Sequence, residues 1–123
     1  MKYFSLDEFD SPDLPGSGIN MDPTFLQMLD NARDFAGIPF KITSGYRTEQ
    51  HNSKVGGVPR SESSKGSSHM YGYAADIACN NSQDRYKIIT SLMDAGFSRI
   101  GLASNFIHID NDPDKVKDVL WTY

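Results

Sequence analysis

Apolar residues recur at helical spacing in two segments of the chain. The first segment starts at Asp22-Pro23, where the aspartate can cap a helix and the proline suits its first turn, and it ends at Gly37. The second runs from about Ser82 to Ala95 and stops at Gly96. We expect two helices with inward faces formed by Phe25, Leu26, Met28, Leu29, Ala32 and Phe35 in the first and by Tyr86, Ile88, Ile89, Leu92 and Met93 in the second.

Shorter alternating or apolar runs predict strands, and a polar turn bounds most of them. A short helix is expected between Arg47 and Asn52, and Asp10 to Asn20 is too rich in proline and glycine for regular structure. This order favours a small α+β domain with a mainly antiparallel sheet and two principal helices. The predicted strands are residues 40–43, 73–79, 99–103, 106–110 and 116–123.

The composition limits what such a domain can be. The chain has 123 residues, 38% of them hydrophobic, which suits a single domain over residues 1–123 with one core. Its one cysteine excludes an internal disulfide and any metal site built from several cysteines. If a transition metal binds here, histidines and carboxylates must hold it.

Charge and hydropathy narrow the function classes. A formal charge of -4 argues against nucleic acid as a partner, because phosphate binding needs a concentrated basic face. The N-terminal residues turn acidic where a signal peptide needs an apolar stretch, and no run approaches the roughly 20 apolar residues of a membrane span. We therefore expect synthesis in the cytoplasm without a signal peptide, no membrane insertion and, since no heptad pattern is present, a monomer.

Candidate chemistry concentrates in the segment from Ser67 to Ile77. His69 leaves a serine-rich loop, and Asp76 follows seven residues later inside an apolar strand. A carboxylate in such a strand needs a cation, strong hydrogen bonds or a metal. Gly72 and the small residues between the two allow the chain to turn so that both side chains converge.

A second histidine, His108, lies in the apolar strand that ends at Asp110, and strand alternation places these two side chains on one face. Two histidines and one carboxylate are the ligand set of a catalytic zinc site, where zinc acidifies a water molecule and polarises a carbonyl. Taken separately, each residue is more often a hydrogen-bonded core histidine or a structural aspartate, so the spacing alone leaves both interpretations open.

The linked motifs resemble a known family. Ser67-x-His69-x-x-Gly72-x-Ala74-x-Asp76 with the later His108 is similar to the signature of the M15 peptidases, which include zinc D-Ala-D-Ala carboxypeptidases and share the Hedgehog fold. Other segments of the chain resemble the phage and bacterial branch of this family, which cleaves peptidoglycan peptides. These segments are Tyr3 to Phe9, Ile42 to Arg47, His51-Asn52, Val55 to Gly57 and the closing Trp121.

The resemblance implies a role for each matching residue. His69, Asp76 and His108 would bind Zn²⁺, Arg47 would engage the substrate through its guanidinium, and Ser67 would hydrogen-bond the substrate or orient the loop. A structural ion pair for Arg47 and a plain loop serine for Ser67 are the alternatives.

The sequence departs from the family at the general base. The acidic residue expected three positions before the last histidine ligand is here Asn105, which cannot accept a proton at neutral pH. Asp110, on the same strand face as His108, is the candidate catalytic base, although it could instead hydrogen-bond a ligand; Glu62 on the long loop is a weaker candidate.

Two other reactive residues are set aside. His51 is interpreted as a residue behind the ligands or as part of the short helix, rather than as a ligand, because an aspartate fills the third ligand position in the family. Cys79 has no histidine beside it in sequence and ends an apolar strand, so packing is its expected role.

Together these features imply a zinc peptidase that hydrolyses peptidoglycan stem peptides, as a carboxypeptidase or an endopeptidase. A phage endolysin that reaches the cell wall after release, or one associated with the virion, is the expected context. Because the peptidase domain is expected to take up residues 1–123, we expect no separate targeting domain. The alternative is a non-catalytic zinc-containing module that binds cell-wall peptide or protein, and Asn105 keeps it open.

Overall fold

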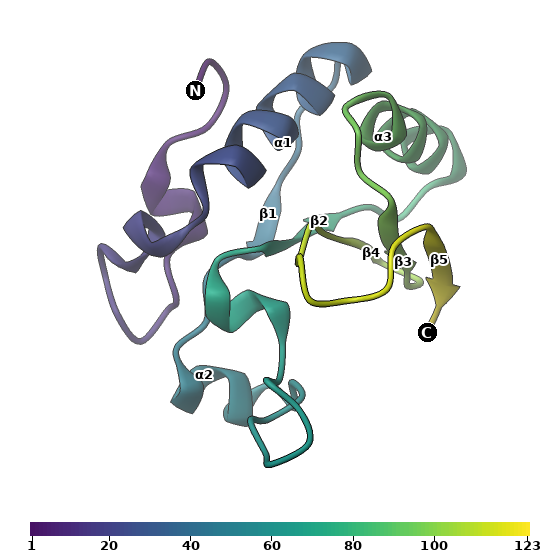
Figure 1. Ribbon diagram of the computed structural model, residues 1–123. Helices are drawn as coiled ribbons and strands as arrows, with labels where there is room; N and C mark the ends of the chain where they lie inside the picture. The colour runs from purple at the N-terminus through teal and green to yellow at the C-terminus, as the bar shows by residue number, and fades with distance from the viewer.

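A five-stranded sheet with the two long helices on one side forms the framework (Figure 1), and the computed structural model describes all residues from Met1 to Tyr123. The strand order is β1-β2-β4-β3-β5, antiparallel throughout except for the parallel pair β3 and β5. This is the expected α+β fold in one small domain. The helices are α1 (Pro23–Ala36), α2 (Glu49–Lys54) and α3 (Ser82–Asp94), and the strands are β1 (Ile42–Ser44), β2 (Ala74–Ala78), β3 (Arg99–Leu102), β4 (Phe106–Asp110) and β5 (Val119–Thr122).

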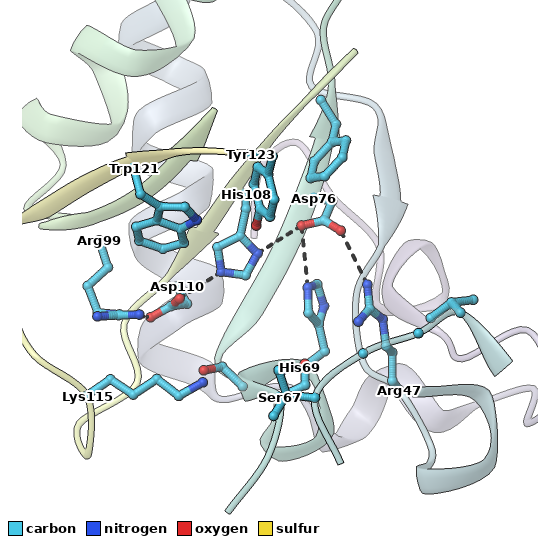
Figure 2. A pocket seen from close by; sticks show the side chains of 16 residues that line it. Arg47, Ser67, His69, Asp76, Arg99, His108, Asp110, Lys115, Trp121 and Tyr123 are labelled. Carbon is cyan, nitrogen blue, oxygen red and sulfur yellow. Dashed lines mark hydrogen bonds and ion pairs between the residues drawn. The ribbon is translucent and has the colours of Figure 1, made fainter. Parts of the chain in front are cut away.

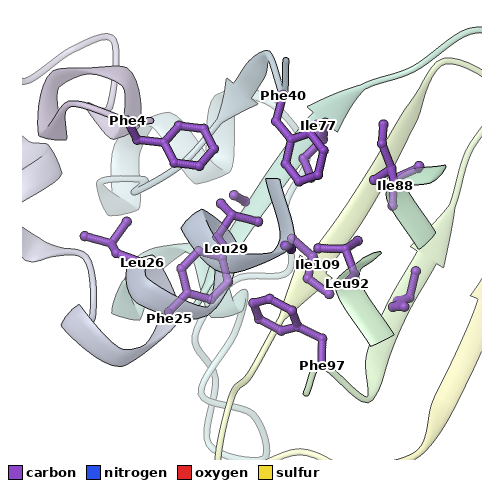
Figure 3. Packing of buried hydrophobic residues seen from close by; sticks show 14 of the residues in the cluster. Phe4, Phe25, Leu26, Leu29, Phe40, Ile77, Ile88, Leu92, Phe97 and Ile109 are labelled. Atoms are coloured by element: carbon purple, nitrogen blue, oxygen red, sulfur yellow. The ribbon is translucent and has the colours of Figure 1, made fainter. Parts of the chain in front are cut away.

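One face of the sheet carries the apolar core. Side chains alternate along a strand, so the isoleucines of β2, β3 and β4 share this face and pack beneath α1 and α3 (Figure 3). The two helices also pack on each other, and Phe25 of α1 meets Phe97 edge to face, with ring centroids 5.6 Å apart. The central strand residues Ile77, Ile100, Ile107 and Ile109 are at most 2% exposed.

The opposite face carries a row of five residues that crosses all the strands. Ser44 pairs with Asp76, Asp76 with His108, His108 with Gly101, and Gly101 with Trp121. Cross-strand partners point to the same side of a sheet. The register therefore aligns the chemistry-bearing residues on the face that the long helices leave open.

The two predicted helices form with the expected ends. Asp22 caps α1 by accepting a hydrogen bond from the Phe25 amide at 2.9 Å, and Gly37 ends it in the left-handed conformation with φ 67°. Three residues assigned to the inward faces are wrong: Phe35, Tyr86 and Met93 are 58%, 71% and 49% exposed. Tyr86 precedes Ile88 by two positions, about 200° around the helix, so it points away from the face that Ile88 and Leu92 define.

Several boundaries differ from the sequence prediction. The segment from Asp10 to Asn20 was expected to lack regular structure but ends in a 3₁₀ turn, Ser17–Asn20, and a second such turn, Leu6–Phe9, lies before it. The first strand and the short helix each begin two residues later than expected, and the last strand is shorter. No helix is long and apolar enough to cross a membrane.

Candidate active site

His69 is held in one orientation by its local structure. It lies in the 3₁₀ turn Ser68–Tyr71, where Ser67 caps the turn by accepting the His69 amide hydrogen bond and Gly72 closes it at φ 78°. His69 Nδ1 lies 2.8 Å from the carbonyl oxygen of Gly45, which can only accept, so Nδ1 carries the proton. The lone pair is therefore on Nε2, which faces Asp76 at 3.4 Å.

The three residues expected to bind zinc lie together on the open face of the sheet (Figure 2). His108 Nδ1 is 3.0 Å from Asp76 Oδ1, and the rings of His69 and His108 meet edge to face with centroids 5.3 Å apart. One ligand atom from each of the three residues lies within 4.8 Å of the others. All three are buried, with Asp76 and His108 each 8% exposed.

Asp110 lies on the other side of the His108 ring. Its Oδ2 is 2.7 Å from His108 Nε2, and its Oδ1 accepts from Arg99 Nε at 2.6 Å and from the Asp112 amide. Both oxygens are thus engaged, at 1% exposure, and they face the ring nitrogen that points away from Asp76. This geometry favours the other role that the sequence left open for Asp110, that of a carboxylate that hydrogen-bonds His108 and orients it, as carboxylates behind metal-binding histidines do.

The charges of the cluster stabilise one another. Burial alone would raise the pKa of the Asp76 carboxyl, but the hydrogen bond from His108 and the charge of His108 outweigh it and hold the pKa below its usual range. Burial opposes the charged form of His108, yet hydrogen bonds to Asp110 and Asp76 raise its pKa. His69 differs, because burial dominates and lowers its pKa, which favours the neutral imidazole that ligates metals.

Arg47 lies beside the cluster, but its guanidinium is engaged within the protein. Nε donates to Ser44 at 2.9 Å, and the terminal nitrogens lie 3.3 Å from Asn52 Oδ1 and 3.4 Å from Asp76 Oδ2. Burial lowers the pKa of this arginine, while the Asp76 charge opposes the shift. Arg47 therefore holds Asp76 in place, in addition to lining the pocket.

A pocket of about 350 Å³ opens over the cluster, a size that suits a small ligand. Arg47, Ser67 and all three ligand candidates line it, and Asp76 and Asp110 are its only carboxylates. Glu62 and Asn105 are exposed and do not line it, which removes Glu62 as a candidate base. The structure thus brings together the predicted ligands, Arg47, Ser67 and Asp110, and leaves Glu62 outside the pocket.

The donor set fits a transition metal such as zinc. Two imidazole nitrogens and one carboxylate oxygen, close together and buried beneath the pocket, are the donor set of a catalytic zinc site. Each histidine also has a hydrogen-bond acceptor on its remaining nitrogen, the Gly45 carbonyl for His69 and Asp110 for His108. Such partners fix the ring and its tautomer for ligation.

Three residues that support the site were missed as such by sequence reasoning. The Trp121 indole lies beside the His108 ring, with ring centroids 5.5 Å apart. The indole passes over Gly101, where a Cβ atom would lie only 2.7 Å from it. Arg99, which holds Asp110, also lies 5.2 Å from the Trp121 ring. Only the register of β3 between β4 and β5 brings these residues together, and nothing local in the sequence signals that register.

The two residues set aside by the sequence analysis lie away from the cluster. His51 is on α2 and lines a different surface hollow beside Pro12. Cys79 is 7% exposed and belongs to the hydrophobic core, as expected.

Comparison with known proteins adds one finding. The family model described as Peptidase M15 matches residues 2–110, which include the whole cluster, whereas no curated protein matches the chain. β5 and the loop before it lie beyond the matched range. The motif order, the fold and this match agree, and the chain belongs to the M15 peptidase family.

Proposed function

We propose that this protein is a zinc-dependent peptidase that hydrolyses peptidoglycan stem peptides. The observation that supports it most is the convergence of His69 Nε2, Asp76 Oδ1 and His108 Nδ1 at the floor of a pocket, in a chain of a peptidase family. When bound there, zinc polarises a carbonyl and acidifies a water molecule.

The protein's own residues prepare the site for that chemistry. Asp110 accepts from His108 Nε2, which leaves Nδ1 as the nitrogen that would bind the metal once the proton it shares with Asp76 is released. Arg99 keeps Asp110 charged and fixed at 2.6 Å. Arg47 likewise forms an ion pair with Asp76, in which Nη2 lies 3.4 Å from Oδ2. The ligands are thus preorganised, which reduces the reorganisation needed during reaction.

Substrate binding involves the pocket rim in this proposal. The Ser67 hydroxyl accepts from the His69 amide and lines the pocket, so its own proton is available to a peptide carbonyl. Arg47 retains N–H groups beyond its three internal contacts and can add one to the substrate.

The biological setting follows from this activity as a further part of the proposal. The protein belongs to the phage-type branch and acts as a monomeric endolysin, made in the cytoplasm and active at the cell wall after release or from the virion. Its reaction is either removal of a terminal D-alanine or an internal cut in the stem peptide.

The test is digestion of purified peptidoglycan by the zinc-loaded protein, with products identified by mass spectrometry. Released D-alanine would indicate a carboxypeptidase, and a shortened stem would indicate an endopeptidase. His108→Ala should yield neither product, while His51→Ala, which changes a histidine outside the cluster, should cleave as the parent does.

Absence of product from the parent at every pH would overturn the peptidase assignment. The non-catalytic zinc-containing binding module would then be favoured, since no carboxylate lining the pocket is free of protein partners.

A further inference from the structure

The pocket is positively charged although the protein is acidic. Arg47, Arg99 and Lys115 line it together with two carboxylates, Asp76 and Asp110, in a chain with a formal charge of -4. Arg47 pairs with Asp76 and Arg99 pairs with Asp110. Lys115 forms no ion pair and no side-chain hydrogen bond, so one positive charge in the pocket remains uncompensated.

The backbone around Lys115 is fixed on both sides. Before it, Asp112 accepts from Ser68 Oγ at 2.7 Å and from Lys65 Nζ at 2.8 Å, and its carbonyl accepts the Lys115 amide at 3.3 Å. After it, the carbonyl of Val116 accepts from Arg99. Lys115 is half-buried and its backbone is anchored, so its side chain starts from a fixed point at the edge of the pocket, which lowers the cost of holding a ligand there.

Figure 2 shows Lys115 and Arg47 on opposite sides of the cluster, with the Lys115 ammonium directed inward. An extended peptide that crosses the metal ligands therefore passes a free cation on one side. Peptidoglycan stem peptides carry carboxylates on D-glutamate, on some diamino acids and at the C-terminus, and an ammonium within reach of a carboxylate forms a charge-assisted hydrogen bond.

We propose that Lys115 is a specificity residue that binds a carboxylate of the substrate, so that the pocket selects acidic stem peptides over amidated ones. This inference rests on the proposed function and deepens it. It concerns a residue beyond the range that the family model matches.

The experiment measures kcat and KM for two synthetic stem pentapeptides, one with free carboxylates and one with every carboxylate amidated. Lys115→Met should raise KM for the acidic peptide about tenfold or more with kcat little changed, and Lys115→Arg should restore most of the affinity. For the amidated peptide, parent and Lys115→Met should have equal KM. Lys117→Met, an exposed change on the same loop outside this pocket, should behave as the parent.

Equal loss for both peptides, no loss for either, or the same loss in Lys117→Met would overturn the inference. If even the parent cleaves neither peptide, the proposed function fails, and calorimetric binding of the two peptides decides the role of Lys115 separately. Tighter binding of the acidic peptide by the parent, but not by Lys115→Met, would support it, and equal binding would refute it.

Discussion

The two faces of one sheet differ completely in chemistry although the same strands build them. Along β4, Ile107 and Ile109 point into the core, while His108 and Asp110 point to the pocket. β2 repeats the division, with Ile77 on the core side and Asp76 on the pocket side. A period of two lets each strand place a hydrophobic residue and a reactive residue side by side without mixing their environments.

The comparison shows where stability and function reside. Burial of the apolar face releases water from hydrocarbon, which favours folding and does not depend on the direction of individual contacts. The pocket face buries charges, which is unfavourable unless each has a partner, and here every buried carboxylate of the cluster has two or more. Substitutions on the core face should therefore lower the stability of the fold, whereas substitutions on the pocket face should change metal binding.

The largest effect on folding is expected on the core face. Ile107→Ala removes a fully buried side chain and should lower the free energy of unfolding by about 2 to 5 kcal/mol. Chemical denaturation measures this, and zinc binding by the folded fraction should be unchanged. A loss of zinc affinity greater than the loss of stability would mean that the two faces are not independent.

On the pocket face, Asp110→Asn separates two roles. If Asp110 orients His108, the variant should bind zinc about 10- to 100-fold more weakly, because Nε2 loses its charged partner. If it were the general base, zinc affinity would persist and only turnover would fall. Zinc titration against a competing chelator, beside the turnover of fully loaded protein, distinguishes these outcomes.

Gly101 tests how the edge strand supports the pocket. An added methyl group would lie 2.7 Å from the Trp121 indole, so Gly101→Ala should cost about 1 to 3 kcal/mol of stability and displace the ring from His108. In a Trp121→Ala background the same change should cost much less, and a denaturation double-mutant cycle reports the difference. Additive effects would show that the contact is unimportant.

The smallest effect on stability is expected where Asp112 accepts hydrogen bonds from Lys65 and Ser68 and so joins two loops. Burial would raise the pKa of Asp112, but hydrogen bonds from Lys65 and Ser68 lower it. Because the folded pKa lies below the unfolded one, the stabilisation is present above about pH 4 and is lost as pH falls through the folded value.

Asp112→Asn should therefore be less stable than the parent at neutral pH by about 1.5 kcal/mol, and the gap should shrink below about pH 4. Denaturation at a series of pH values measures it. Asp114→Asn removes the exposed partner of the same lysine and should change little. A gap that stays constant down to pH 2 would contradict the assignment.

The parts of the fold that local patterns encode were predictable. Helical spacing and end signals located α1 and α3, and alternation placed His108 and Asp110 on one face. The ligand trio came from the motif resemblance, and the structure brings its members together.

What sequence reasoning missed depends on contacts between distant segments. The parallel pairing of β5 with β3 sets Trp121 opposite Gly101, and the pairing of β3 with β4 sets Arg99 opposite Asp110. Without that register, Asp110 resembles a free carboxylate beside a ligand. With it, both oxygens are seen to be engaged, which favours a positioning role for Asp110 over that of a base.

The metal site itself is tested by the zinc content of purified protein, measured by elemental mass spectrometry for the parent, His69→Ala and His51→Ala. We expect about one zinc per chain in the parent and in His51→Ala, and almost none in His69→Ala. Equal zinc in all three proteins would contradict the ligand set, and with it the assignment of the pocket face as a metal-dependent active site.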